Sequence, residues 1–172
     1  LNLKGSETIT YHNNSPDDLE YLWLQLDENQ QSNIKDANYQ SGSTLPNFTT
    51  TERLKTTDLP EKDNGFGVNI EKVVDASGKP LPYIINKTMM RIDLPKILKS
   101  GEKLVFTIDW NYNMPDRMKQ GGRGGYEYFP EDGNHIFTLT QWYPRMCVYS
   151  DFKGWQNNQF TGRGEFALTF GD

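Results

Sequence analysis

Turn-forming residues recur about every ten residues along the chain, and the segments between the turns alternate apolar and polar side chains. The clearest segment places Leu22, Leu24 and Leu26 on one face of an extended chain. A chain of this kind has little room for long helices. Composition agrees, because the sequence holds 9 Tyr, 9 Phe and 4 Trp, whereas alanine occurs only at Ala37, Ala76 and Ala167. We predict an all-β fold, a saddle-like sheet or sandwich of mostly antiparallel strands.

Extended segments are predicted throughout the chain. The strong turn at 13–18 suggests that the first two form a β-hairpin. Residues 95–100, followed by a glycine, have room for one helical turn at most. The predicted strands cover residues 1–11, 21–26, 66–74, 81–85, 88–94, 103–112, 126–129, 135–142, 145–149 and 165–170.

One long polar stretch, residues 28–64, interrupts this pattern. We interpret it as a surface excursion between strands, with a short helical turn at 33–39. No internal repeat and no linker divides the chain, so residues 1–172 are predicted to form one domain. The first residue is Leu1, and the chain stops two residues after an apolar run. We therefore expect an excised amino-terminal β-domain that is truncated at both ends.

Composition and charge exclude several classes. No run of 18 apolar residues is present, which predicts no membrane span. The net charge of −5 disfavours nucleic-acid binding through a broad positively charged surface. The single cysteine, Cys147, excludes an internal disulfide, and His12 and His135 are too few for a multi-histidine zinc site. No metal site is expected in this chain.

Individual motifs favour structural roles. The glycine cluster at 121–125 precedes a strand-like segment rather than the Gly-Lys-Ser/Thr of a phosphate-binding loop, which predicts a flexible loop. Glu127, Glu131 and Asp132 lie at a turn, and nothing in the sequence fixes their separation as acid–base catalysis requires. Cys147 has no obvious base beside it and is predicted to be a buried thiol. We expect no catalytic residue here.

The densest part of the sequence is residues 138–164, where aromatic rings alternate with amide side chains. Rings supply contact area and amides supply direction for a polar organic ligand such as a peptide or a sugar. Trp142 and Trp155 are equally well explained as core residues, because large aromatics dominate core burial. The residues alone leave both interpretations open.

The same segment carries a resemblance to a known family. The motifs are Thr140-Gln141-Trp142-Tyr143-Pro144-Arg145-Met146, Gly154-Trp155-Gln156 and Gly162-Arg163-Gly164-Glu165-Phe166, with 13–17, 19–27 and 124–130 in support. Together they resemble the amino-terminal domain of aminopeptidase N-type zinc metallopeptidases, in the branch found in Bacteroidetes. The resemblance covers nearly the whole chain, and residues 28–64 match least. It implies a saddle-like β-domain that packs on a thermolysin-like catalytic domain further along the same protein.

The family resemblance also implies roles for individual residues. The catalytic domain of the family holds zinc through His-Glu-x-x-His and a further Glu, and this sequence contains no His-Glu pair. In the family, a Thr-Gln-x-Glu segment of the amino-terminal domain lines the pocket for the first substrate residue. Gln141 matches the Gln, whereas Tyr143 stands at the Glu position and offers no negative charge to an ammonium group. The expected substrate-binding residues are Gln141, Trp142 and Tyr143.

The resemblance further implies peptide substrates, zinc only in the downstream catalytic domain, and export to the periplasm or cell surface. No activity is expected from this chain alone. The alternative hypothesis is a β-sandwich binding module that recognises a glycan or a peptide through Trp142, Tyr143 and Trp155.

Overall fold

The computed structural model describes residues 1–35, 48, 50, 51, 63–122 and 124–159. The predicted strand at 165–170, the Gly162-Arg163-Gly164-Glu165-Phe166 motif and most of the predicted turn at 33–39 lie outside these residues. Residues 33–35 do form a turn.

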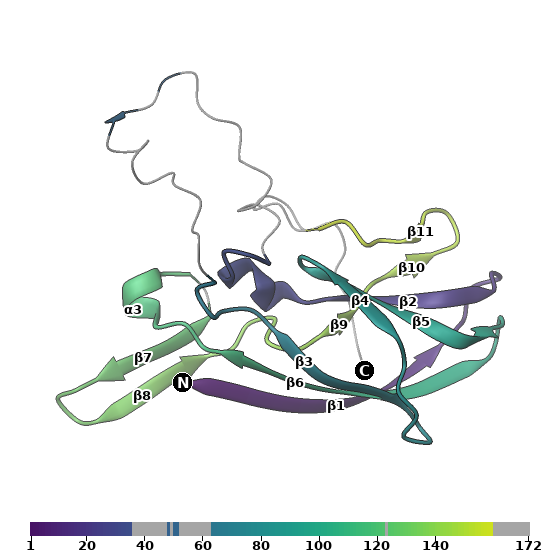
Figure 1. The fold of residues 1–172 in the computed structure, drawn as a ribbon, viewed down its shortest axis with the longest axis horizontal. Coiled ribbons are helices and arrows are strands. Elements are labelled where there is room, and N and C mark those ends of the chain that lie inside the picture. The colour runs from purple at the N-terminus through teal and green to yellow at the C-terminus, as the bar shows by residue number, and fades with distance from the viewer. Residues whose placement is uncertain (36–47, 49, 52–62, 123, 160–172) are drawn as a thin grey trace.

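Two antiparallel sheets make up most of the domain (Figure 1). The first has the order β1-β6-β3 and is built from β1 (Asn2–His12), β6 (Lys103–Asn113) and β3 (Asn69–Asp75). The second has the order β4-β5-β2-β9 and is built from β4 (Tyr83–Asn86), β5 (Met89–Leu98), β2 (Leu19–Gln25) and β9 (Arg145–Met146). The prediction of an all-β fold with mostly antiparallel strands is confirmed.

Smaller elements complete the described structure. The 3-10 helix η1 (Asp27–Gln31) follows β2, and one helical turn, α3 (Arg117–Gln120), follows β6. Strands β7 (Gly125–Phe129) and β8 (Asn134–Thr138) form a hairpin that projects from one end of the molecule. Strands β10 (Tyr149–Ser150) and β11 (Gly154–Trp155) form a short two-stranded sheet.

One core lies between the two large sheets. Leu22, Leu24 and Leu26 are completely buried, as the alternation of this segment predicts. The facing residues Phe106, Ile108 and Trp110 of β6 are also buried. The Trp110 ring covers Gly5 of β1 so closely that a Cβ atom at this position would collide with it. The alternating pattern therefore predicted the inward faces correctly.

The predicted hairpin between the first two strands is wrong. β1 pairs with β6, and β2 pairs with β5 and β9, so residues 13–18 carry the chain from one sheet to the other. The connection from β5 to β6 makes the same crossing beside it. Asn13 ties the two crossings together: its backbone N–H donates to Glu102 O (2.9 Å), its carbonyl accepts from Gly101 N–H (2.7 Å), and its side chain donates to Leu98 O (3.0 Å).

Asn13 is completely buried, so its side-chain hydrogen bonds have no water to replace them. We expect Asn13→Ala to lower the free energy of unfolding by about 1–3 kcal/mol, because it leaves buried backbone acceptors without a donor. Urea denaturation followed by tryptophan fluorescence measures this change. Asn14→Ala, at the exposed neighbouring position, is the matched control and should change stability little. Equal effects at the two positions would contradict the assigned role.

Residues 95–100, which have room for one helical turn at most, form none, because β5 continues to Leu98, which is buried and paired with Leu19. One other prediction needs correction. The strand predicted at 135–142 ends at Thr138, and Gln141 then takes a left-handed backbone conformation (φ 54°) that an extended strand cannot accommodate.

The polar stretch that begins at residue 28 is not a surface excursion at its start. Glu28, Asn29 and Ser32 are buried. The Asn29 side chain accepts a hydrogen bond from Val68 N–H (2.7 Å) and donates one to Lys87 O (2.6 Å). Asn29 thus joins η1 to the start of β3 and to the β4–β5 turn. A polar residue whose side-chain oxygen and nitrogen are both hydrogen-bonded can be an interior residue, which composition alone does not reveal.

Candidate functional site

The segment Thr140–Arg145 presents two side chains to solvent from a fixed backbone. Gln141 is exposed and Tyr143 keeps 40% of its surface exposed. Between and after them, Trp142 packs partly buried against the core and Pro144 is fully buried. The Trp142 ring lies 6.0 Å from the Trp110 ring and 5.4 Å from the Tyr143 ring, centroid to centroid. The structure therefore places all three predicted binding residues together.

Gln141 has an unusual backbone. Its φ of 54° lies in the left-handed region, which non-glycine residues adopt only at an energetic cost. Among the described residues, only Lys87 is a second non-glycine residue with positive φ, and it lies in the tight turn between β4 and β5. Such strain persists where the surrounding structure enforces it, and it is often found at binding sites. Here the partly buried Trp142 and the buried Pro144 hold the chain on one side.

Arg145 fixes the other end of the segment. It pairs with Gln25 in the β2–β9 ladder, and its guanidinium donates from Nε and Nη2 to Asp27 Oδ2 at 2.9 and 2.7 Å. Nη2 also donates to Gln25 Oε1 at 3.0 Å. Arginine suits this position because its planar fork holds a carboxylate through two donors at once. Gln25 ends β2 and Asp27 begins η1 two residues later, so the strand that builds the core also positions the site.

Glu28 is a buried carboxyl next to Asp27 in sequence, and sequence reasoning missed it. Burial, together with the neighbouring charge of Asp27, raises the pKa of Glu28 to about 7. A Cβ atom placed on Gly124 would lie 3.5 Å from Glu28 Oε1 and 3.3 Å from Thr140 Oγ1. The 3-10 helix, the glycine cluster and the Thr140 segment therefore meet at one place. No sequence pattern predicts that Glu28 is buried, because it lies in a polar stretch for which exposure to solvent is expected.

The glycine cluster at 121–125 has a fixed backbone at its last residue, Gly125. Gly125 has φ 131°, and a Cβ atom there would collide with the Pro115 carbonyl. Tyr126 N–H donates to the same carbonyl at 2.9 Å, which closes the backbone over this point. The predicted flexible loop therefore ends in a tightly fixed glycine, while Arg123 lies outside the described residues.

Other candidate residues lie apart from this site or serve the structure. Glu127 forms an ion pair with Arg117 (3.1 Å), and Asp132 accepts from Asn134 N–H at the hairpin turn. His135 is stacked among aromatic rings on the β7–β8 hairpin, 4.7 Å from Tyr128. Cys147 is buried, and burial raises the pKa of its thiol to about 12, which confirms the prediction of a buried thiol.

Trp155 belongs to a different aromatic cluster. Its ring lies 5.8 Å from Tyr11 and 5.2 Å from Tyr149. Trp142 contacts Trp110 and Tyr143 instead, and no ring contact joins the two clusters among the described residues. Both tryptophans pack against the core. The structure does not combine them into one aromatic binding surface.

Two further observations concern metal and membrane. In the described ranges, no three His, Cys, Asp or Glu side chains are grouped as metal ligands. Within the same ranges, every helix is too short or too polar to serve as a transmembrane segment.

Comparison with known protein families, curated proteins and solved structures gives no match to the chain.

Proposed function

We propose that this chain is the non-catalytic amino-terminal β-domain of an aminopeptidase N-type zinc metallopeptidase. In this proposal Gln141, Trp142 and Tyr143 line the pocket for the first residue of a peptide substrate. The observation that carries the proposal is the clamped segment, in which a strained, exposed Gln141 is held between core-packed Trp142 and ion-paired Arg145. This combination suits a pocket wall, because a segment whose backbone is fixed before the ligand arrives loses less entropy on binding.

The proposal assigns distinct chemistry to each residue. The Gln141 amide donates and accepts hydrogen bonds and suits the backbone of a peptide. Trp142 sets the position of the segment through its contact with Trp110. Tyr143 offers a ring face and a hydroxyl but no charge, so a substrate ammonium must find its carboxylate elsewhere.

The remaining parts of the proposal concern the whole protein. Zinc would be held by a catalytic domain that follows in the same chain, where the metal would activate a water for peptide hydrolysis. This catalytic domain would also be the packing partner of the β-domain. The family branch favours export to the periplasm or cell surface.

The decisive test is Gln141→Ala in the longer protein. We expect kcat/KM on aminoacyl substrates to fall about tenfold, since the loss of one site hydrogen bond costs about 1.4 kcal/mol of transition-state binding. Lys79→Ala, on the exposed turn between β3 and β4, is the control and should leave kcat/KM unchanged. An unchanged value for Gln141→Ala would remove the pocket assignment.

The glycan-binding alternative has less support. It needs tryptophan faces open to a ligand, whereas Trp142 and Trp155 pack against the core in separate clusters. Titration of the chain with glycans while tryptophan fluorescence is recorded still distinguishes the two proposals. Saturable quenching would favour the binding module.

A further inference from the structure

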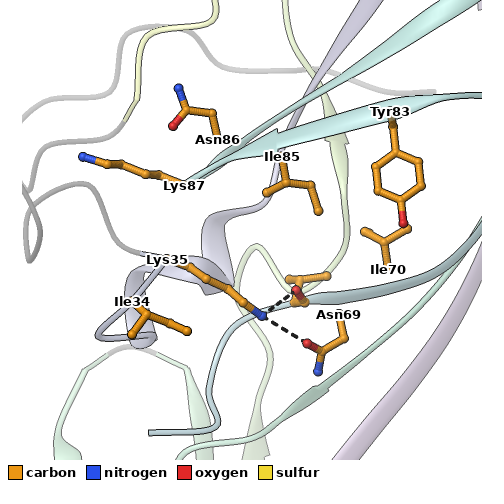
Figure 2. Close-up of a pocket in the computed structure, with 9 residues that line it drawn as sticks. Ile34, Lys35, Asn69, Ile70, Tyr83, Ile85, Asn86 and Lys87 are labelled. Atoms are coloured by element: carbon orange, nitrogen blue, oxygen red, sulfur yellow. Dashed lines mark hydrogen bonds between the residues drawn. The ribbon is translucent and has the colours of Figure 1, made fainter. Parts of the chain in front are cut away.

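An open groove of about 450 Å³ lies between the free edges of the two large sheets (Figure 2), and its lining includes no residue of the Thr140–Arg145 segment. β3 is the last strand of one sheet and β4 is the last strand of the other. The two edges come together where Leu81 N–H donates to Val73 O at 3.0 Å. Tyr83 and Ile85 point from β4 toward Ile70 on β3, as Figure 2 shows. The lining therefore includes an apolar part, formed by Tyr83, Ile85 and Ile70.

The β4 edge is unusually exposed and apolar. All four residues of β4 are exposed, and Ile84 keeps 57% of its surface accessible. Among the described strands, β4 pairs only with β5, which leaves its outer edge without a ladder partner. Free edges are usually protected by charge, proline or a bulge, and the Tyr-Ile-Ile-Asn sequence has neither charge nor proline. Such an edge is suited to accept an added strand.

Lys35 gives the groove a positive charge. Its Nζ donates to Val68 O (3.2 Å) and to Asn69 Oδ1 (3.0 Å), both neutral acceptors. An ammonium group carries three N–H donors, so one has no partner among the residues that the structure describes and can serve a ligand. Among the described residues, no carboxylate lies within ion-pair distance of this ammonium. Asp63 acts on it only from further away, and burial lowers the pKa of Lys35.

We propose that the groove binds an extended peptide that adds as a strand to β4 and places one carboxylate against the Lys35 ammonium. The apolar side chains of the peptide would cover Tyr83, Ile85 and Ile70. The charge argues against a second copy of this chain as the occupant, because the β4 edge from Tyr83 to Lys87 holds no acidic residue. The site is independent of the pocket proposed above.

The first arm of the test measures charge recognition. The probe is a fluorescein-labelled peptide, Thr-Val-Thr-Glu-Thr-Val, whose binding to the 172-residue chain is followed by fluorescence anisotropy. We expect Lys35→Met to weaken binding about tenfold, because it keeps the aliphatic stem and removes the charged hydrogen bond. The same peptide with Gln in place of Glu should bind both proteins equally and weakly. Lys103→Met, at an exposed lysine outside the groove, is the matched control and should bind like the unaltered chain.

The second arm tests strand addition. N-methylation of alternate peptide residues blocks every second backbone N–H, and a strand turns only alternate N–H groups toward its neighbour. One of the two methylation patterns should abolish binding while the other has little effect. No binding of the glutamate peptide, equal binding of the two methylated peptides, or insensitivity to Lys35→Met would each overturn the proposal. If the chain self-associates and the peptide does not bind, the proposal of a peptide partner is overturned in favour of a second copy of the chain.

Discussion

Replacement of Arg145 by alanine is expected to lower the free energy of unfolding by about 3–5 kcal/mol. The Arg145 and Asp27 side chains keep only 15% and 11% of their surface exposed, and Arg145 Nη2 lies 2.7 Å from Asp27 Oδ2. Truncation of the arginine removes the guanidinium that faces the Asp27 carboxylate in a site with little water. The large effect therefore comes from a buried Asp27 carboxylate that has lost its guanidinium partner, more than from the lost attraction itself.

Urea denaturation at pH 7 measures this effect, and two variants make the result specific. Lys96→Ala removes an ion pair to Glu102 whose side chains are 77% and 42% exposed, and it should cost less than about 1 kcal/mol. Asp27→Asn added to Arg145→Ala replaces the buried carboxylate by a neutral amide and should restore part of the lost stability. A loss below 1 kcal/mol for Arg145→Ala, or no recovery in the double variant, would contradict this account of the clamp.

Arg145 also positions the proposed binding pocket. It follows directly on Pro144 and anchors the segment that presents Gln141 and Tyr143. Arg145→Lys should fail to restore the clamp fully, because an ammonium is a point charge and cannot reproduce the two-donor contact with Asp27.

The strands and their inward faces could be predicted from sequence because alternation is a local property. Leu22, Leu24 and Leu26 face the core, and so do Phe106, Ile108 and Trp110. Strand pairing could not be predicted in the same way. The turn at 13–18 is compatible with a hairpin or with a crossing between sheets, and only the long-range pairing of β1 with β6 decides between them. Local turn chemistry says where a chain bends and leaves open which strand it joins.

The candidate site was predicted only in part for a related reason. Gln141, Trp142 and Tyr143 are sequence neighbours, so a dense polar and aromatic segment pointed to all three. The clamp joins Arg145 to Asp27 across 118 positions, and no sequence pattern connects them. Asn29 and Glu28 lie among polar residues in sequence, which predicts exposure to solvent. Both are buried, and Asn29 is held in the interior by its side-chain hydrogen bonds.

Glu28 should make the domain less stable as pH rises from about 5 to 8. Its pKa rises from 4.5 in an unfolded chain to about 7 in the folded protein because burial disfavours the charged form. Below pH 4.5 the carboxyl is protonated in both states and contributes no difference. Above pH 7 it is ionised in both, and the folded state bears the full cost of the buried charge, at most about 3 kcal/mol. The loss of stability therefore develops between these two pKa values.

Glu28→Gln keeps the shape of the side chain and removes the titration. We expect the variant to match the unaltered chain near pH 4.5 and to exceed its stability by up to about 3 kcal/mol at pH 8, measured by urea denaturation at each pH. Glu7 on β1 has a pKa raised to about 7 by burial as well, so Glu7→Gln should flatten the profile in the same way, and the two changes together should flatten it further. Glu131→Gln, on the exposed hairpin turn, should leave the profile unchanged. If the Glu28→Gln profile instead runs parallel to that of the unaltered chain from pH 5 to 8, the Glu28 carboxyl is solvated and its pKa is not raised by burial.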